Sequence, residues 1–232
     1  MSDFDDINAR GLVLVGCGRM GGAMLQGWLA RGLVKPQMMG GALSAMPDLS
    51  GSLVISVAAG TTIATFEAAF PGAPVIRVMP NTPAAIGQGI SAMIGNGAAT
   101  PAHLDLAEAL MRAVGRVVRL EHEGQMDAVT GLSGSGPAYV FHLIEAMAAA
   151  GEAQGLSPAL SLELARMTVA GAGALAVHAD EDPVVLRRNV TSPNGTTAAG
   201  LAVLMDDDAG LTPLMVRTVA AATERGRELG RG

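Results

Sequence analysis

The pattern of hydrophobic and polar positions changes about halfway along the chain. In the first half, short apolar runs alternate with stretches of helical periodicity. Short runs rich in β-branched residues are typical of strands buried in a parallel sheet. The pattern predicts strands at 12–15, 53–57, 75–79, 90–94 and 116–120, and helices at 20–31, 63–70 and 101–114. Strands that alternate with helices in this way indicate an α/β domain with a parallel sheet.

Beyond residue 122 the strand pattern ends and only helices are expected. Their predicted ranges are 137–153, 158–178, 183–190, 196–205 and 212–229. The change from α/β to all-α predicts two domains, 1–122 and 123–232. Within the second domain, 138–150 and 167–177 are apolar on nearly every side, so both segments must be buried all round. We therefore expect a homodimer formed through the helical domain, with higher assembly left open.

Composition and charge narrow the classes of function. Half of the 232 residues are hydrophobic, and the formal net charge of −6 argues against binding to nucleic acid. Cys17 is the only cysteine, which excludes an intrachain disulfide and a thiolate zinc cluster. The acidic N-terminus is unlike a signal peptide, and the longest uncharged helical run is shorter than the ~20 residues of a membrane span. These features predict a cytoplasmic protein without a membrane segment.

A glycine-rich turn lies between the first predicted strand and the first predicted helix. The sequence from Gly16 to Gly21 matches G-x-G-x-x-G, in which glycines permit a tight turn and let a pyrophosphate approach the backbone. Free N–H groups at the start of the helix would face the phosphates. The motif favours dinucleotide binding, and a tight turn without a ligand is the alternative.

Three further segments, 78–83, 131–140 and 189–197, read Val-Met-Pro-Asn-Thr-Pro, Gly-Leu-Ser-Gly-Ser-Gly-Pro-Ala-Tyr-Val and Asn-Val-Thr-Ser-Pro-Asn-Gly-Thr-Thr. With the glycine-rich turn, and in this order, they make the chain resemble pyrroline-5-carboxylate reductases over essentially its whole length. The resemblance implies an oxidoreductase that reduces 1-pyrroline-5-carboxylate to L-proline, the last step of proline biosynthesis. It implies NADPH as cofactor, with NADH possible, a Rossmann-type domain and a helical dimerisation domain.

The resemblance also assigns roles to individual residues. Thr197 would contact the imine nitrogen as the catalytic hydroxyl, while Ser192, Gly195 and Thr196 would bind the substrate carboxylate. From the residues alone, a Ser/Thr helix cap after a Pro-Asn-Gly turn is the favoured reading of this segment. The cofactor-binding residues implied by the family are Gly16, Cys17, Gly18, Arg19, Met20, Gly21, Lys35, Asn81 and Thr82.

Two departures from the family pattern stand out. The family's Val-Lys-Pro-Gln segment follows the fourth strand, but here it comes at 34–37, directly after the first helix. We expect a shortened Rossmann domain that lacks the second and third strands, roughly 40 residues and more than one βαβ unit. Asn194 replaces a preferred glycine, and Asn tolerates positive φ. A non-catalytic homologue that dimerises or binds a proline-like ligand is the alternative function.

Other polar residues do not indicate a further functional site. His142 and Glu145 are three residues apart on a predicted helix, but no third ligand accompanies them, so no metal site is expected. Ser133 and Ser135 lack the full G-x-S-x-G pattern of a hydrolase. Ser135 is instead predicted to be the N-cap of the helix that contains Pro137.

Overall fold

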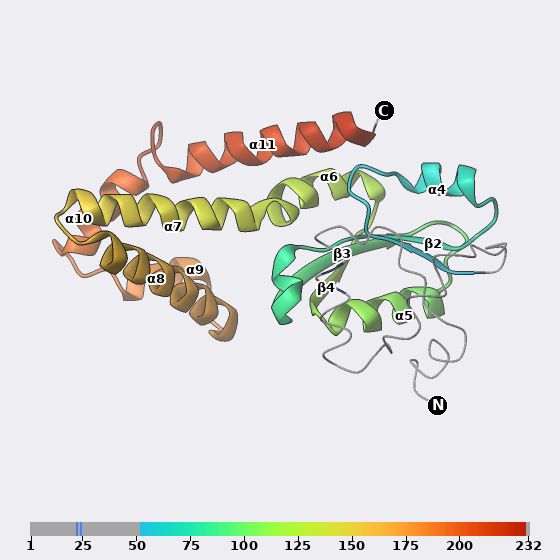
Figure 1. Cartoon of the computed structure of the whole chain (residues 1–232), viewed down its shortest axis with the longest axis horizontal. Coiled ribbons are helices and arrows are strands. Elements are labelled where there is room, and N and C mark those ends of the chain that lie inside the picture. Colours follow the sequence, from blue (N-terminus) through green and yellow to red (C-terminus); the bar gives the residue numbers. More distant parts are fainter. Residues whose placement is uncertain (1–21, 23, 25–51, 231–232) are drawn as a thin grey trace. The chain divides into compact units, whose positions relative to one another are not determined.

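A computed structural model describes residues 22, 24 and 52–230, which form two compact units. The described residues up to Pro137, together with those from Ala220 onward, make up one, here called the sheet unit (Figure 1). The helical unit is Ala138–Val219. The division by compactness thus differs from the domain limits predicted at 122 and 123, which stay a prediction.

The sheet has four strands in the order β1-β2-β3-β4: β1 (Val54–Ser56), β2 (Val75–Met79), β3 (Gly89–Gly95) and β4 (Gly115–Arg119). The strands pair in parallel at β1–β2 and β3–β4, but β2 and β3 are antiparallel. The prediction of a parallel sheet is therefore wrong at its centre. The connection from Met79 to Gly89 explains this, since it is too short for the crossover of a dozen or more residues that a parallel pair needs.

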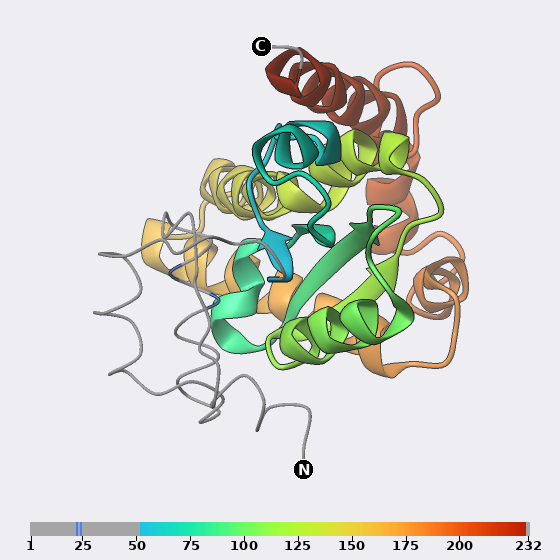
Figure 2. The ribbon, with the colours of Figure 1, turned by 90° about the vertical axis from the view of Figure 1, so that its right-hand side faces the viewer.

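Helices cover both faces of this sheet. α5 (Pro101–Arg112) lies on one face, and α4 (Ile63–Ala69) and α6 (Met126–Val129) lie on the other (Figure 2). α5 begins where the sequence predicts, because Pro101 follows a Thr100 N-cap whose hydroxyl accepts from the His103 N–H. The core between α5 and the sheet is built of fully buried side chains, among them Ile76, Val78, Met93, Leu110 and Met111.

The segment after β4 is more helical than expected. A short 3-10 turn, η3 (Glu123–Gln125), leads into α6, then into a π-helix, η4 (Thr130–Gly134), and then into α7 (Gly136–Ala153). Ser135 has φ −84° and ψ −19°, and its N–H donates to the Thr130 carbonyl at 2.9 Å. The prediction of Ser135 as an N-cap is therefore wrong, because an N-cap residue has extended dihedrals and starts a helix.

The remaining helices agree with the predicted ranges to within two residues at each end. They are α8 (Pro158–His178), α9 (Pro183–Asn189), α10 (Thr196–Leu204) and α11 (Leu211–Gly230), whose residues from Ala220 belong to the sheet unit. Ser157 and Asp182 cap α8 and α9, and each cap is followed by a proline in the first helical turn. Local start signals thus determine these boundaries.

Part of the prediction lies outside the described residues. This applies to the first strand at 12–15, to most of the first helix and to the region from which strands are expected to be missing. Gly22 and Met24 are helical, within the predicted helix 20–31, and Met24 is fully buried in the core of the sheet unit.

Candidate functional site

The carboxyl ends of β1 and β2 form one edge of the parallel pair. Ser56 pairs with Arg77 in register, so the loop 57–62 and the segment that begins at Pro80 leave the sheet at the same end. Ligands of open α/β sheets bind outside the carboxyl ends of the strands. This end of β1 and β2, with the loop 57–62 and Pro80–Thr82, is called the ligand edge below.

Asn81 and Thr82, predicted to bind the cofactor, lie at this ligand edge. Asn81 is buried, and its Oδ1 accepts from the Ile90 N–H at 2.9 Å, which ties the turn to the first residues of β3. Thr82 is exposed and begins η2 (Thr82–Ile86). The side-chain oxygen of Asn81 therefore has a structural partner. The side-chain amide nitrogen of Asn81 and the Thr82 hydroxyl are the polar groups that this turn offers to a ligand.

The four residues predicted for substrate lie around the start of α10. Asn194 has φ +59°, the left-handed conformation that was expected for this Asn in place of a glycine. Gly195 is the N-cap, and a side chain there would overlap Ser192 Oγ. Ser192, Thr196 and Thr197 are exposed in the single chain.

This arrangement can hold an anion. The first N–H groups of a helix have no acceptor within it, and they carry the positive end of the helix dipole. No side-chain cap hydrogen bond occupies the start of α10 within the described residues. The helix start, with hydroxyls at 192, 196 and 197, therefore suits a carboxylate and a polar nitrogen beside it.

The structure places the predicted residues in two groups. Asn81 and Thr82 belong to the sheet unit, and Ser192, Gly195, Thr196 and Thr197 belong to the helical unit. The glycine-rich turn from Gly16 to Gly21, with Lys35, lies outside the described residues. Their roles stay predictions.

One feature of the sheet unit was not predicted. Arg77 is almost fully buried in β2, and its Nη1 donates to Glu123 Oε1 at 2.7 Å. Nothing near Glu123 in the sequence indicates a partner 46 residues away. A basic residue inside an apolar strand was the available signal, since a buried charge requires a partner.

Charged groups of the described residues do not gather into a metal site. Among the residues that the structure describes, no group of three or more His, Cys, Asp or Glu side chains is arranged to hold an ion. His142 Nδ1 and Glu145 Oε2 lie 3.0 Å apart, and both side chains are exposed to solvent. They form a surface pair on α7.

α8 is long and apolar enough, by length and composition alone, to cross a membrane, and little of it is buried within one chain. A core helix of an assembled protein meets the same criterion. The expectation that the apolar helices require a partner fits this bare surface.

Comparison with known proteins defines the class of the chain. Residues 123–229 match the family model for pyrroline-5-carboxylate reductase dimerisation. The second half of the chain thus matches the dimerisation region of this family, and an α/β unit precedes it.

Relatives extend the likeness to the first half. The chain is 43% identical over 199 residues to a pyrroline-5-carboxylate reductase of Synechocystis, covering 85% of this chain and 73% of that protein. It is 42% identical, over 84% of its own length and 72% of the other, to the reductase of Pseudomonas aeruginosa. The chain belongs to the pyrroline-5-carboxylate reductase family.

Solved structures of pyrroline-5-carboxylate reductases share the fold of this chain. The Coxiella burnetii pyrroline-5-carboxylate reductase superposes with a TM-score of 0.80 at 28% identity, covering 92% of this chain and 96% of that one. The Plasmodium falciparum pyrroline carboxylate reductase, solved with NADP bound, superposes with a TM-score of 0.78 at 27% identity, covering 93% and 97%. None of these comparisons favours the non-catalytic alternative.

Proposed function

We propose that this chain reduces 1-pyrroline-5-carboxylate to L-proline with NAD(P)H, as the last step of proline biosynthesis. The observation that carries the proposal is the 43% identity to a reductase over 85% of the chain, which spans both the ligand edge and the start of α10. Family resemblance confined to the dimerisation region would support an assembly role equally well.

The substrate carboxylate is proposed to bind at the start of α10. The N–H groups of its first turn, with the Ser192 and Thr196 hydroxyls, supply donors to the two oxygens. Gly195 leaves room there, because its missing side chain would otherwise overlap Ser192. This contact fixes the position and orientation of the ring, which lowers the entropic part of the barrier.

Thr197 is proposed to act on the imine nitrogen. A bound reduced nicotinamide supplies the hydride, which adds to the imine carbon while the carbon–nitrogen double bond becomes single. The nitrogen gains a proton in the same overall reaction. The Thr197 hydroxyl holds a hydrogen bond to this nitrogen and so stabilises the change in its charge.

The described residues fit a nicotinamide cofactor at the ligand edge. The Asn81 amide and the exposed Thr82 hydroxyl offer both donors and acceptors to a carboxamide. The glycine-rich turn and Lys35 are proposed to hold the phosphate side, within a Rossmann-type domain that lacks its second and third strands. NADPH is the preferred cofactor in this proposal, and NADH is the alternative.

The chain is proposed to work as a cytoplasmic homodimer. Its helical unit leaves large apolar side chains exposed on α7 and α8, and a second copy is the occupant that the dimerisation family model indicates. Higher assembly of dimers is compatible with this arrangement.

The test is loss of reduced-cofactor absorbance in the presence of pyrroline-5-carboxylate. Thr197→Val, which keeps the shape but removes the hydroxyl, is expected to lower kcat about 100-fold. Thr197→Ser keeps the hydroxyl and is expected to retain most of the activity. Equal activity in the Val and Ser variants would contradict the role of Thr197, and a folded wild type without turnover would contradict the function.

A further inference from the structure

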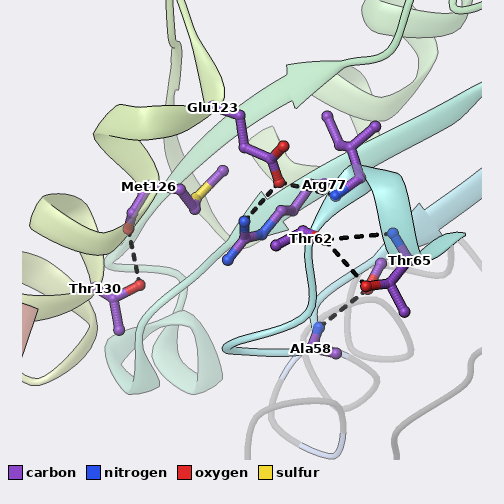
Figure 3. Close-up of polar contacts among 9 residues, drawn as sticks. Ala58, Thr62, Thr65, Arg77, Glu123, Met126 and Thr130 are labelled. Carbon is purple, nitrogen blue, oxygen red and sulfur yellow. Dashed lines mark hydrogen bonds and ion pairs between the residues drawn. The ribbon is translucent and has the colours of Figure 1, made fainter. Parts of the chain in front are cut away.

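Two hydrogen bonds converge on one carboxylate oxygen in the sheet unit. Glu123 Oε1 accepts from Arg77 Nη1 at 2.7 Å and from the Ile63 N–H at 2.8 Å. Figure 3 shows the Glu123 carboxylate and the Arg77 guanidinium directed toward one another. The Arg77 side chain is 5% exposed and that of Glu123 is 30% exposed, so the pair is shielded from water mainly on the arginine side.

Both donors adjoin the ligand edge. Ile63 is the first residue of α4 and directly follows the loop 57–62 that leaves β1. Its N–H is one of the donors that a helix cannot satisfy itself, and a carboxylate at that end also complements the helix dipole. Arg77 lies in β2, four residues before Asn81 and opposite Ser56 of β1.

A second contact joins β2 to the segment that contains Glu123. Side chains two residues apart on a strand share a face, so Met79 lies on the Arg77 face of β2. A Cβ built on Gly134 of the π-helix η4 would lie 2.5 Å from Met79 Cε. The segment 123–134 therefore contacts β2 both beside Arg77 and at the residue that precedes Pro80.

We propose that Glu123 is a positioning residue for the cofactor: through Ile63 and Arg77 it holds the loop 57–62 and the end of β2 at the spacing that the ligand edge needs. This inference rests on the proposed function. Glu123 acts through its two donors, and no contact of its own with substrate or cofactor is required.

The charge of Glu123 matters as much as its shape. Arg77 is buried, and a buried charge without its partner is strongly unfavourable, so Arg77 would move toward water if the carboxylate were lost. Such a move would displace the end of β2, which lies close to Asn81. Hydrogen bonds to a charged group are also stronger than those between neutral groups, so a glutamine at 123 would hold both donors less firmly.

The experiment is a titration of the full-length protein with NADPH, followed by fluorescence, for wild type and Glu123→Gln. The matched control is Glu121→Gln, which removes the same charge from an exposed side chain two residues away. We expect the Kd for NADPH to rise about tenfold in Glu123→Gln and less than about twofold in Glu121→Gln. In the assay, the KM for NADPH should rise by a similar factor, with the KM for pyrroline-5-carboxylate within about twofold of wild type.

A purely structural role gives a different result. It would lower the melting temperature of Glu123→Gln while leaving its Kd for NADPH like that of the control, and this result would overturn the proposal. So would an equal rise of both KM values. If Glu123→Gln does not fold, Glu123→Asp replaces it, because it keeps the charge but shortens the reach, and the same criteria apply.

The titration separates this inference from the proposed reaction. A wild type that binds NADPH but does not turn over would contradict the reaction, while the Kd comparison would still decide the role of Glu123. A wild type that does not bind NADPH overturns the inference.

Discussion

The sheet unit buries many of its large apolar side chains, whereas the helical unit leaves many of its own exposed. In the sheet unit, Ile76 and Met93 are fully buried between the sheet and α5. In the helical unit, Phe141 on α7 is 60% exposed and Met167 on α8 is 64% exposed. The first has a core of its own within one chain, whereas the second presents more apolar surface than a monomer ordinarily leaves in water. Within the described residues, one chain therefore buries the core of its sheet unit by itself but leaves the apolar surface of its helical unit uncovered.

The largest effect is expected from a charge on the bare helical surface. Phe141→Asp would bury an unpaired carboxylate in a homodimer interface, at a cost of about 3–5 kcal/mol, which is more than 100-fold in the dimer dissociation constant. Sedimentation velocity at micromolar concentration should show a dimer for the wild type and a monomer for the variant. Val118→Asp places the same charge at an exposed apolar position of β4 in the sheet unit and should stay dimeric. A dimeric Phe141→Asp would remove the proposed difference between the two units.

A smaller effect is expected within the sheet core. Met93→Ala removes a fully buried side chain from β3 and leaves a cavity, so the free energy of unfolding should fall by about 2–5 kcal/mol. Urea denaturation followed by circular dichroism measures the change. Ile86→Ala, at a 74% exposed position of the same unit, should cost less than about 1 kcal/mol. Similar losses for both variants would show that this core does not stabilise the sheet unit.

The smallest effect concerns an ion-pair cluster between α5 and β4. Glu108 accepts from Arg112 Nε and Arg119 Nε, both at 2.7 Å, and Arg119 also pairs with Asp105. The hydrogen bond from Arg112, followed by that from Arg119, lowers the pKa of Glu108 below its ordinary value of 4.5. Because the pKa is lower in the folded state, the stabilisation is complete above pH 4.5 and is lost as the pH falls through the folded-state pKa.

Glu108→Gln should therefore lower the free energy of unfolding by about 0.5–1 kcal/mol at pH 7 and by almost nothing at the acid end of a pH series. Denaturant unfolding at each pH measures this difference against wild type, with Glu121→Gln as the control. A difference that stays constant with pH would contradict the ion-pair explanation.

Local signals account for the part of the fold that was predicted from sequence. Pro101, Pro158 and Pro183 each follow a capping side chain, and the helices begin there as predicted. The direction in which two strands pair has no such local signal in the sequence. The apolar runs of β2 and β3 look alike whether the strands are parallel or antiparallel, and only the short connection between them reveals the reversal.

The helical conformation of 130–135 was not predicted from the sequence, because glycine is unfavourable inside helices. In the structure this segment is helical, and the Thr130 and Ser133 hydroxyls donate to the carbonyls of Met126 and Val129, four residues earlier. Such bonds are typical of Ser and Thr inside helices. Because Ser and Thr favour caps and turns over helix interiors, these two residues did not signal the helix in advance.

The candidate site likewise has one part that could be predicted from the sequence and one part that could not. Asn194 in the left-handed conformation follows from the residue type, so the turn before α10 was predictable. The Glu123 carboxylate was not, because its partners at 63 and 77 are brought to it only by the folded sheet.

The central claim is that this chain transfers a hydride to the imine carbon of 1-pyrroline-5-carboxylate. The most direct measurement uses NADPH carrying deuterium at both C4 positions, with mass spectrometry of the product. The account predicts L-proline that contains a single deuterium on carbon, because only one hydride is transferred in each reduction. A folded, dimeric protein that forms no labelled proline under these conditions would contradict it.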